Sequence, residues 1–231
     1  MPSLKILSGG AAQGLVNALA PQFETQTGFR IEGEFGAVGA MAAKLRSGVS
    51  ADLLILTSAL IAELTREGYV ASGSSADVGS VQTAIAVRTG DTHPAIGNAA
   101  TLRGTLLASD AIYFPDPEQA TAGIHFAGVL RSLGIWDEVA LRLHTFPNGA
   151  TAMRELAASS YLRPIGCTQI TEMLSTSGVT LVGPLPSGCE LATEYTAAVC
   201  ADAAFPDNAH ALRLLLTGDA SRESRRRAGF E

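Results

Sequence analysis

The chain has 231 residues, of which 47% are apolar and 16% charged, and its formal net charge at pH 7 is −6. This composition excludes a disordered chain and provides enough apolar residues for one large domain or two small lobes. The acidic balance excludes the basic surface that nucleic-acid binding needs. No apolar stretch approaches the ~20 residues that span a bilayer, so no membrane insertion is predicted.

Strand and helix patterns alternate along the first 70 residues. Short apolar runs predict strands at residues 4–7 and 52–57, and alternating residues predict a strand at 30–35. A helical periodicity follows each run: Gly28 closes the first helix, the second carries Met41 and Leu45, and the third covers residues 58–68. Residues 71–80 are rich in Ser, Gly and Ala, which predicts a connection.

The second half repeats this alternation after a strand at residues 81–88 that we expect to cross between lobes. Further strands are predicted at 111–114, 142–146, 164–167 and 179–182, with helices beginning near residues 98, 121, 149 and 168. The strand at 179–182 should stop at Gly183-Pro184. Residues 193–201 read as a returning strand and 207–216 as a terminal helix. The alternation predicts an α/β fold whose mainly parallel sheets are flanked by helices.

Three cysteines, Cys167, Cys189 and Cys200, show no metal-ligand spacing, and no cofactor or metal is predicted. Their odd number favours a reducing compartment, although a Cys189–Cys200 bridge stays open. Residues 1–7 lack the pattern of a secretory leader. We therefore expect a cytoplasmic protein as the chain stands, or a periplasmic one if a leader has been removed.

One feature recurs four times: a predicted strand ends, a loop of small residues follows, and a helix begins. These segments are Ser8-Gly9-Gly10-Ala11, Gly36-Ala37-Val38-Gly39, Thr121-Ala122-Gly123 and Asn148-Gly149-Ala150. Small residues allow a ligand to approach the backbone, and the N–H groups and dipole at a helix start favour a negative charge. The pattern predicts a cage for a small anion; the alternative is four ordinary tight turns.

The segment Asp116–His125, which reads DPEQATAGIH, resembles the Asp-Pro-x-x-x-Pro-Ala-Gly-Ile-Tyr segment of molybdate-binding proteins of ABC importers. Residues 14–19 and 51–55 also resemble that family's first helix and one of its strands. The resemblance implies a two-lobed type II periplasmic-binding-protein fold with two hinge crossovers. Lobe I would comprise residues 1–82 and 192–231, and lobe II residues 83–191. A possible partner is an ABC importer, if the chain is exported.

Carried over by position, the resemblance implies ligand contacts at Ser8, at residues 37–39, at Ala122 and at Gly149. The family usually has serine hydroxyls where this chain has Ala37-Val38-Gly39, and often a tyrosine where it has Cys167-Thr168-Gln169. Each missing charge-assisted hydrogen bond would cost about 1.5–3 kcal/mol. These departures favour a changed ligand, such as a carboxylate, on a retained scaffold.

Five side chains are further candidates, each with a structural alternative. His125 could donate to an anion or move a proton, or could simply cover a lobe surface. Arg88 could bind a carboxylate at the lobe junction, or lie at an exposed strand end. Tyr195 could hydrogen-bond a ligand or be structural. Thr121 and Thr168 could contact the ligand or cap their helices.

These observations predict a solute-binding protein that holds a small oxyanion or carboxylate between two lobes that hinge shut. The alternative is an isomerase of a small unsaturated tricarboxylate, because some bacterial aconitate isomerases are similar to molybdate-binding proteins. Its proton shift would need a base, for which His125 is the candidate. A third hypothesis, a nucleotide-dependent oxidoreductase, depends on a partial dinucleotide pattern at Gly9, Gly10 and Gly14.

Overall fold

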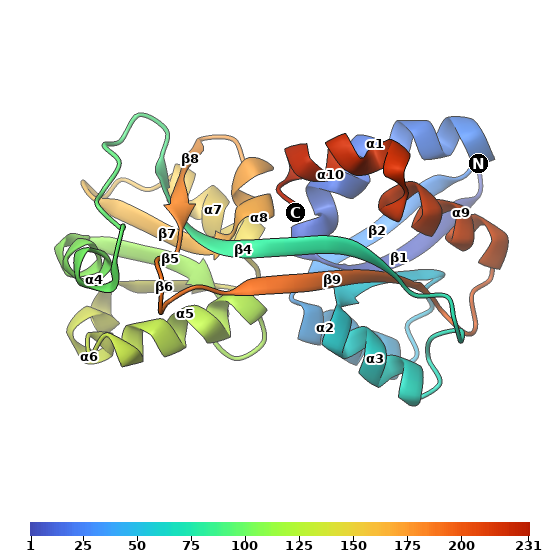
Figure 1. Cartoon of the computed structure of the whole chain (residues 1–231), viewed down its shortest axis with the longest axis horizontal. Helices are drawn as coiled ribbons and strands as arrows, with labels where there is room; N and C mark the ends of the chain where they lie inside the picture. Colours follow the sequence, from blue (N-terminus) through green and yellow to red (C-terminus); the bar gives the residue numbers. More distant parts are fainter. The chain divides into compact units, whose positions relative to one another are not determined.

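The computed structural model describes all 231 residues and divides the chain into two compact units. Unit 1 comprises Met1–Val81 and Thr193–Glu231, and unit 2 comprises Gln82–Ala192. The chain leaves unit 1 within strand β4 (Ala76–Arg88) and returns at the beginning of strand β9 (Ala192–Val199) (Figure 1). No helix is both long and apolar enough to cross a membrane.

Unit 1 is built on a mixed sheet in the order β2-β1-β3-β9. Its strands are β1 (Ser3–Gly9), β2 (Arg30–Gly36), β3 (Leu53–Thr57) and β9. The pairs β1–β2 and β1–β3 are parallel, whereas β9 runs antiparallel to β3. The carboxyl ends of β1, β2 and β3 therefore share one edge of the sheet, the edge at which ligands bind in α/β folds.

Helices cover both faces of the sheet in unit 1. They are η1 (Gly10–Ala12), α1 (Gln13–Thr27), α2 (Val38–Arg46), α3 (Ser58–Arg66), α9 (Pro206–Thr217), η3 (Asp219–Ser221) and α10 (Arg222–Ala228). Figure 1 shows α1, α9 and α10 on one side of this sheet and α2 and α3 on the other. Gly28 ends α1 in the left-handed conformation, with φ +72°.

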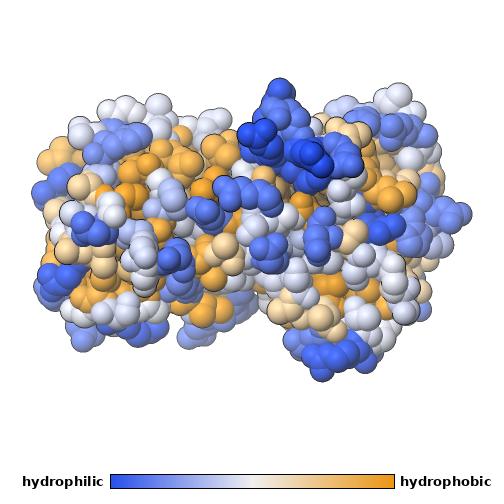
Figure 2. All heavy atoms as spheres, in the orientation of Figure 1, coloured by the Kyte–Doolittle hydropathy of each residue, from blue (hydrophilic) through white to orange (hydrophobic).

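The charged helix α10 lies on the surface, as the basic run at Arg222–Arg227 predicts. Figure 2 shows strongly hydrophilic residues gathered over it. Its charges are largely paired within the segment, since Arg222 lies 2.6 Å from Asp219 and Arg227 lies 3.0 Å from Glu223. Such exposed pairs are worth little individually.

Unit 2 has the sheet order β4-β7-β5-β6, with β8 also paired to β4. Its strands are β4, β5 (Ala111–Pro115), β6 (Leu143–Phe146), β7 (Pro164–Gln169) and β8 (Val179–Pro184). The pairs β5–β6 and β5–β7 are parallel, whereas β4 runs antiparallel to β7 and β8. The antiparallel pairs of both units thus involve β4 or β9, the strands on which the chain crosses between them.

Alternating side chains give the sheet of unit 2 two apolar faces. Its helices are α4 (Ala99–Ala108), α5 (Thr121–Ser132), α6 (Trp136–Val139), η2 (Ala140–Arg142), α7 (Gly149–Ala157) and α8 (Ile170–Leu174). Ile112 and Phe114 pack with residues of α4, α5 and α6. Ala111 and Tyr113 of the same strand pack with residues of α7 and α8.

The α/β prediction is confirmed, and two local predictions are wrong. Residues 76–80 belong to β4, which is the sheet neighbour of β9; Ser80 also exchanges two backbone hydrogen bonds of 2.9 Å with Glu231. Strand β8 continues through Gly183-Pro184, since a proline without an N–H group is tolerated at the end of a strand. The four-residue helix α6 was not predicted. All three cysteines are free, which removes the Cys189–Cys200 bridge.

Candidate functional site

The turns after β1 and β2 lie together in unit 1, because Ser8 and Gly9 pair with Phe35 and Gly36. Ser8 is fully buried, and its hydroxyl donates to the Gly9 carbonyl at 2.9 Å. A Cβ atom at Gly9 would lie 2.8 Å from Val38 and 2.9 Å from Tyr195. Packing between the two turns therefore requires the small residue at Gly9, whether or not a ligand approaches it.

The two turns end at helix starts without side-chain caps. Gly9 precedes η1, which contains Gly10, and Ala37 precedes α2, which begins with Val38 and Gly39. A side-chain cap is absent at both positions, so the first N–H groups of these helices stay available for another acceptor. This is the geometry expected of a backbone anion site.

A hydroxyl chain at the end of β3 escaped the sequence analysis. Ser58, the first residue of α3, lies 2.7 Å from the Thr196 hydroxyl, which donates to the Asp77 carboxylate at 3.0 Å. Thr57 caps α3 through the N–H group of Leu60. The signal available in the sequence is the pair Thr57-Ser58, where the strand predicted at 52–57 meets the helix predicted from residue 58. Asp77 fell in the predicted connection.

Tyr195 lies in β9 opposite Thr57, and only 2% of its surface is exposed. Its ring packs edge-on against Phe230, with centroids 6.1 Å apart, and closes over Gly9. Tyr195 is thus part of the core of unit 1 next to the candidate turns.

In unit 2, helix α5 begins after β5 without a side-chain cap. Ala120 is the N-cap residue and Thr121 the first helical residue, so the N-cap alternative for Thr121 is wrong. Ala122 and Gly123 are buried in the first turn. A Cβ atom at Gly123 would clash with the carbonyl groups of Pro115 and Asp116, so close packing on the end of β5 requires this glycine.

His125 is half-buried, and its Nε2 atom lies 2.8 Å from the carbonyl oxygen of Cys189. A carbonyl only accepts, so Nε2 carries a proton and Nδ1 remains the ring atom that can take one. This contact fixes the ring within unit 2 and limits any acid–base role to Nδ1.

The start of α7 is already occupied by a carboxylate of the chain. Asn148 caps the helix, with its Oδ1 atom accepting from the N–H group of Thr151 at 2.8 Å. The buried Glu172 carboxylate accepts from the Thr168 hydroxyl at 2.5 Å, and it lies so close to Gly149 that an added Cβ atom there would clash with it. Gly149 and Thr168 are therefore engaged with Glu172. Neither is available to a ligand in the way the sequence suggested.

Burial raises the pKa of Glu172, while hydrogen bonds from Thr168 and from three backbone N–H groups oppose the rise. Burial also raises the pKa of Cys167. A thiol held neutral in this way is a poor nucleophile, so Cys167 offers no covalent chemistry.

Arg88 is removed from the candidate site. Its guanidinium group binds Asp91 through two hydrogen bonds, of 2.9 and 3.2 Å, and donates to the Ser159 carbonyl at 2.5 Å. Arg88 lies six positions along the strand from Gln82, the first residue of unit 2, which is a span of about 20 Å. Arg88 also lies beyond Ala86, which pairs with Gly166, toward the amino end of β7. The carboxyl-end turns lie at the opposite edge.

The model of the bacterial extracellular solute-binding protein family matches residues 4–231. The chain belongs to this family. It is 26% identical over 230 residues to an aconitate isomerase of a Pseudomonas species. The matched region covers 95% of this chain and 84% of that relative.

Solved structures of two binding proteins have the same fold as this family member. The periplasmic molybdate-binding protein of Azotobacter vinelandii superposes with a TM-score of 0.81 at 18% identity, over 99% of this chain and 98% of the other. The sulfate-binding protein SubI of Mycobacterium tuberculosis superposes with a TM-score of 0.77 at 19% identity, over 100% of this chain and 86% of the other. The predicted type II periplasmic-binding-protein fold is confirmed.

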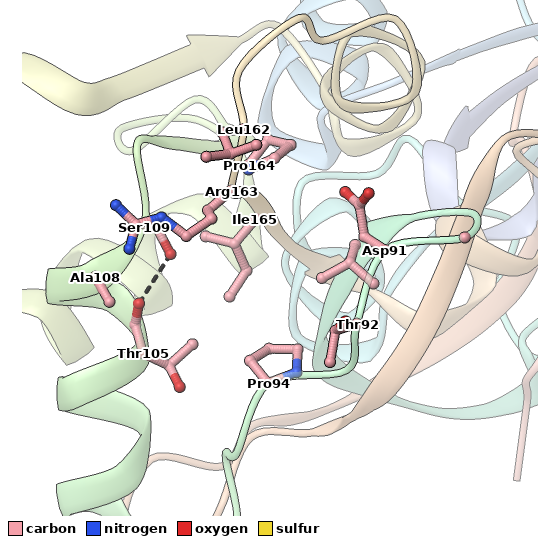
Figure 3. Close-up of a pocket in the computed structure, with 12 residues that line it drawn as sticks. Asp91, Thr92, Pro94, Thr105, Ala108, Ser109, Leu162, Arg163, Pro164 and Ile165 are labelled. Carbon is pink, nitrogen blue, oxygen red and sulfur yellow. Dashed lines mark hydrogen bonds between the residues drawn. The ribbon is translucent and has the colours of Figure 1, made fainter.

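This solute-binding protein also has a cavity of about 520 Å³ within unit 2. Figure 3 shows Asp91, Thr92 and Pro94 facing Thr105 and Ser109 across it. The cavity includes Pro164, the first residue of β7, so it lies at the amino end of that strand. Its lining is mainly apolar, and the edge is the one opposite the helix starts. We therefore do not assign the anion site to it.

Proposed function

We propose that the chain is a solute-binding protein for a small anion, an oxyanion or a carboxylate. Each unit by itself offers uncapped helix starts as candidate ligand contacts: those of η1 and α2 in unit 1, and that of α5 in unit 2. The observation that carries the proposal is the shared edge at which the turns after β1 and β2 meet, with no side chain capping either helix. Unpaired N–H groups and helix dipoles favour a negative charge there.

The hydroxyl chain supports a ligand contact from unit 1. Ser58 stands at the first position of α3, on the same edge as Ser8. The Thr196 hydroxyl donates its hydrogen bond to Asp77, so Ser58 is the donor in the contact between Ser58 and Thr196. An anion beside Ser58 would draw that proton toward itself, which makes Ser58 a candidate donor.

Thermal shift measurements test the proposal. The protein is melted alone and with molybdate, sulfate, phosphate or tricarboxylates, and one class should raise Tm in a saturable way. The Thr121→Asp variant should lose this shift, because a carboxylate in the first turn of α5 competes for the helix start. The Ala100→Asp variant places the same charge in the first turn of α4 and should keep it. If no anion shifts Tm, the proposal is wrong.

The family description, an extracellular solute-binding protein, supports export and delivery of the ligand to an ABC importer. Cell fractionation of the native producer would test the location. Recovery of the protein only from the cytoplasm would count against delivery.

The relative in Pseudomonas favours a second candidate, isomerisation of aconitate. The reaction moves one proton between allylic carbons and shifts the double bond, so a single base can return the proton it takes. His125 would act through Nδ1, because the Cys189 carbonyl holds Nε2.

Incubation with trans-aconitate, followed by detection of the cis isomer, tests this candidate. The His125→Gln variant should abolish conversion while retaining ligand-dependent stabilisation. Turnover that persists in this variant would remove His125 as the base. The absence of turnover in the unmodified protein would leave the binding function alone.

A further inference from the structure

Helix α7 begins at a site that would suit an anion but is filled from within the chain. The first N–H groups of a helix have no partner inside it. Here the Glu172 carboxylate lies directly against Gly149, the first residue of the helix, and the N–H group of Thr151 donates to Asn148. The nine-residue helix therefore keeps its own anion at its N-terminus.

The contacts of Glu172 are those of a bound anion. The residue is 5% exposed and forms no ion pair with Lys, Arg or His, so hydrogen bonds and the helix dipole alone stabilise its charge. The hydrogen bond of 2.5 Å from Thr168 has the length typical of a hydroxyl donating to a carboxylate, about 2.5–2.7 Å. A Cβ atom at Gly149 would clash with both side chains, so only glycine leaves room for the carboxylate.

Thr168 and Gly149 lie beside the other candidate turns of unit 2. Strands β6 and β7 run parallel to β5, so their carboxyl ends share an edge with the end of β5, from which α5 follows. The Asp116 N–H group, after β5, donates to the Phe146 carbonyl of β6 at 2.7 Å. The edge thus carries one open helix start, that of α5, and one closed by Glu172.

We propose that Glu172 is an internal anion that removes α7 from ligand binding and determines the charge of the ligand that the chain accepts. It cancels the partial charge of about +0.5 at the helix start and repels a second negative group. The chain therefore disfavours tetrahedral dianions such as molybdate and sulfate relative to carboxylates with less charge near α7. This specificity role rests on the proposed anion binding; the internal contact does not.

Chemical rescue tests the internal contact. The Glu172→Ala variant should melt at a lower temperature than the unmodified protein. Sodium formate should stabilise it saturably, relative to sodium chloride at equal ionic strength. At ten times its dissociation constant, formate should raise the folded-to-unfolded ratio roughly tenfold. The unmodified protein and Glu172→Gln, which fill the space, should not respond. A folded Glu172→Ala protein that formate leaves unchanged would overturn the proposal.

Calorimetric titration with sodium molybdate and sodium sulfate tests the specificity role. Glu172→Gln should bind these dianions roughly tenfold more tightly than the unmodified protein. Glu155→Gln removes the same charge from the exposed face of α7 and should not change the affinity. Equal affinity in Glu172→Gln and the unmodified protein would refute the specificity role, even if Glu172→Ala fails to fold. If neither binds any anion, the proposed function fails, while the formate experiment still decides the contact.

Discussion

Substitution of Gly149 by alanine separates two opposed effects at the start of α7. Helix propensity alone favours alanine over glycine by about 0.5–1 kcal/mol. The added Cβ atom, however, would clash with Glu172 Oε2 and with Thr168 Oγ1. Forcing a methyl group into packed structure costs about 1–3 kcal/mol, and losing one hydrogen bond to the carboxylate costs about 1.5–3 kcal/mol more. We expect Gly149→Ala to lower the free energy of unfolding by about 2–5 kcal/mol.

Urea unfolding followed by tryptophan fluorescence measures this effect, because the only tryptophan, Trp136, lies in unit 2. Because this fluorescence reports on unit 2, the unfolding of the two units is not treated as a single two-state transition. Gly128→Ala is the matched control: this glycine lies on the exposed face of α5, and an added Cβ atom would meet nothing within 4 Å. The control should be stabilised by about 0.5–1 kcal/mol. A Gly149→Ala protein as stable as this control would refute the reasoning.

Three further predictions concern other buried groups. Phe230→Ala should lower the free energy of unfolding of unit 1 by about 3–5 kcal/mol, measured by thermal melting, because Phe230 is 2% exposed and packs against Tyr195; a smaller loss than for an exposed Phe205→Ala control would contradict it. Burial raises the pKa of Cys200 to about 12. The neutral thiol therefore stabilises the fold fully below the unfolded pKa of about 8.5, and this contribution is lost as pH rises toward 12. Cys200→Ala should reduce the fall in Tm at alkaline pH, and an unchanged fall would argue against this reasoning. Burial likewise raises the pKa of Glu172, so its contribution is complete below about pH 4.3 and declines as pH rises through the folded value; Glu172→Gln should lack that decline in a Tm–pH series.

The regular elements could be predicted because their signals are local. The spacing of Leu15, Leu19 and Phe23 and the closing Gly28 specify α1, and all three apolar residues are buried. The apolar run at Leu53–Leu56 specifies β3 in the same way. The beginning of β4 could not be predicted, since its sheet neighbour is β9, more than 100 residues further along the chain, and Ser80 bonds to Glu231 at the chain's end. Pairing at that sequence distance leaves no periodic pattern to read.

The candidate site shows the same division between local and distant causes. The turns at Ser8–Gly10 and at residues 37–39 were found because each has its own pattern of small residues before a helix. The sequence did not show why these glycines are required. Gly9 leaves space for Val38, and Gly123 leaves space for the carbonyl groups of Pro115 and Asp116. A glycine that admits a ligand and one that admits a neighbouring strand look identical in a sequence.

Glu172 shows why a pattern of helix starts cannot by itself give the ligand. The same residue types at α5 and α7, small and without an acidic first turn, predicted two equivalent anion contacts. One of them is satisfied by a carboxylate 23 residues further along the chain, delivered by the short helix α8. Because that carboxylate already lies against Gly149 in the first turn of α7, a ligand can use α7 only by displacing it and leaving a buried charge unpaired. The cost of leaving a charge uncompensated in the interior is several kcal/mol, so the ligand should adapt to Glu172 rather than replace it.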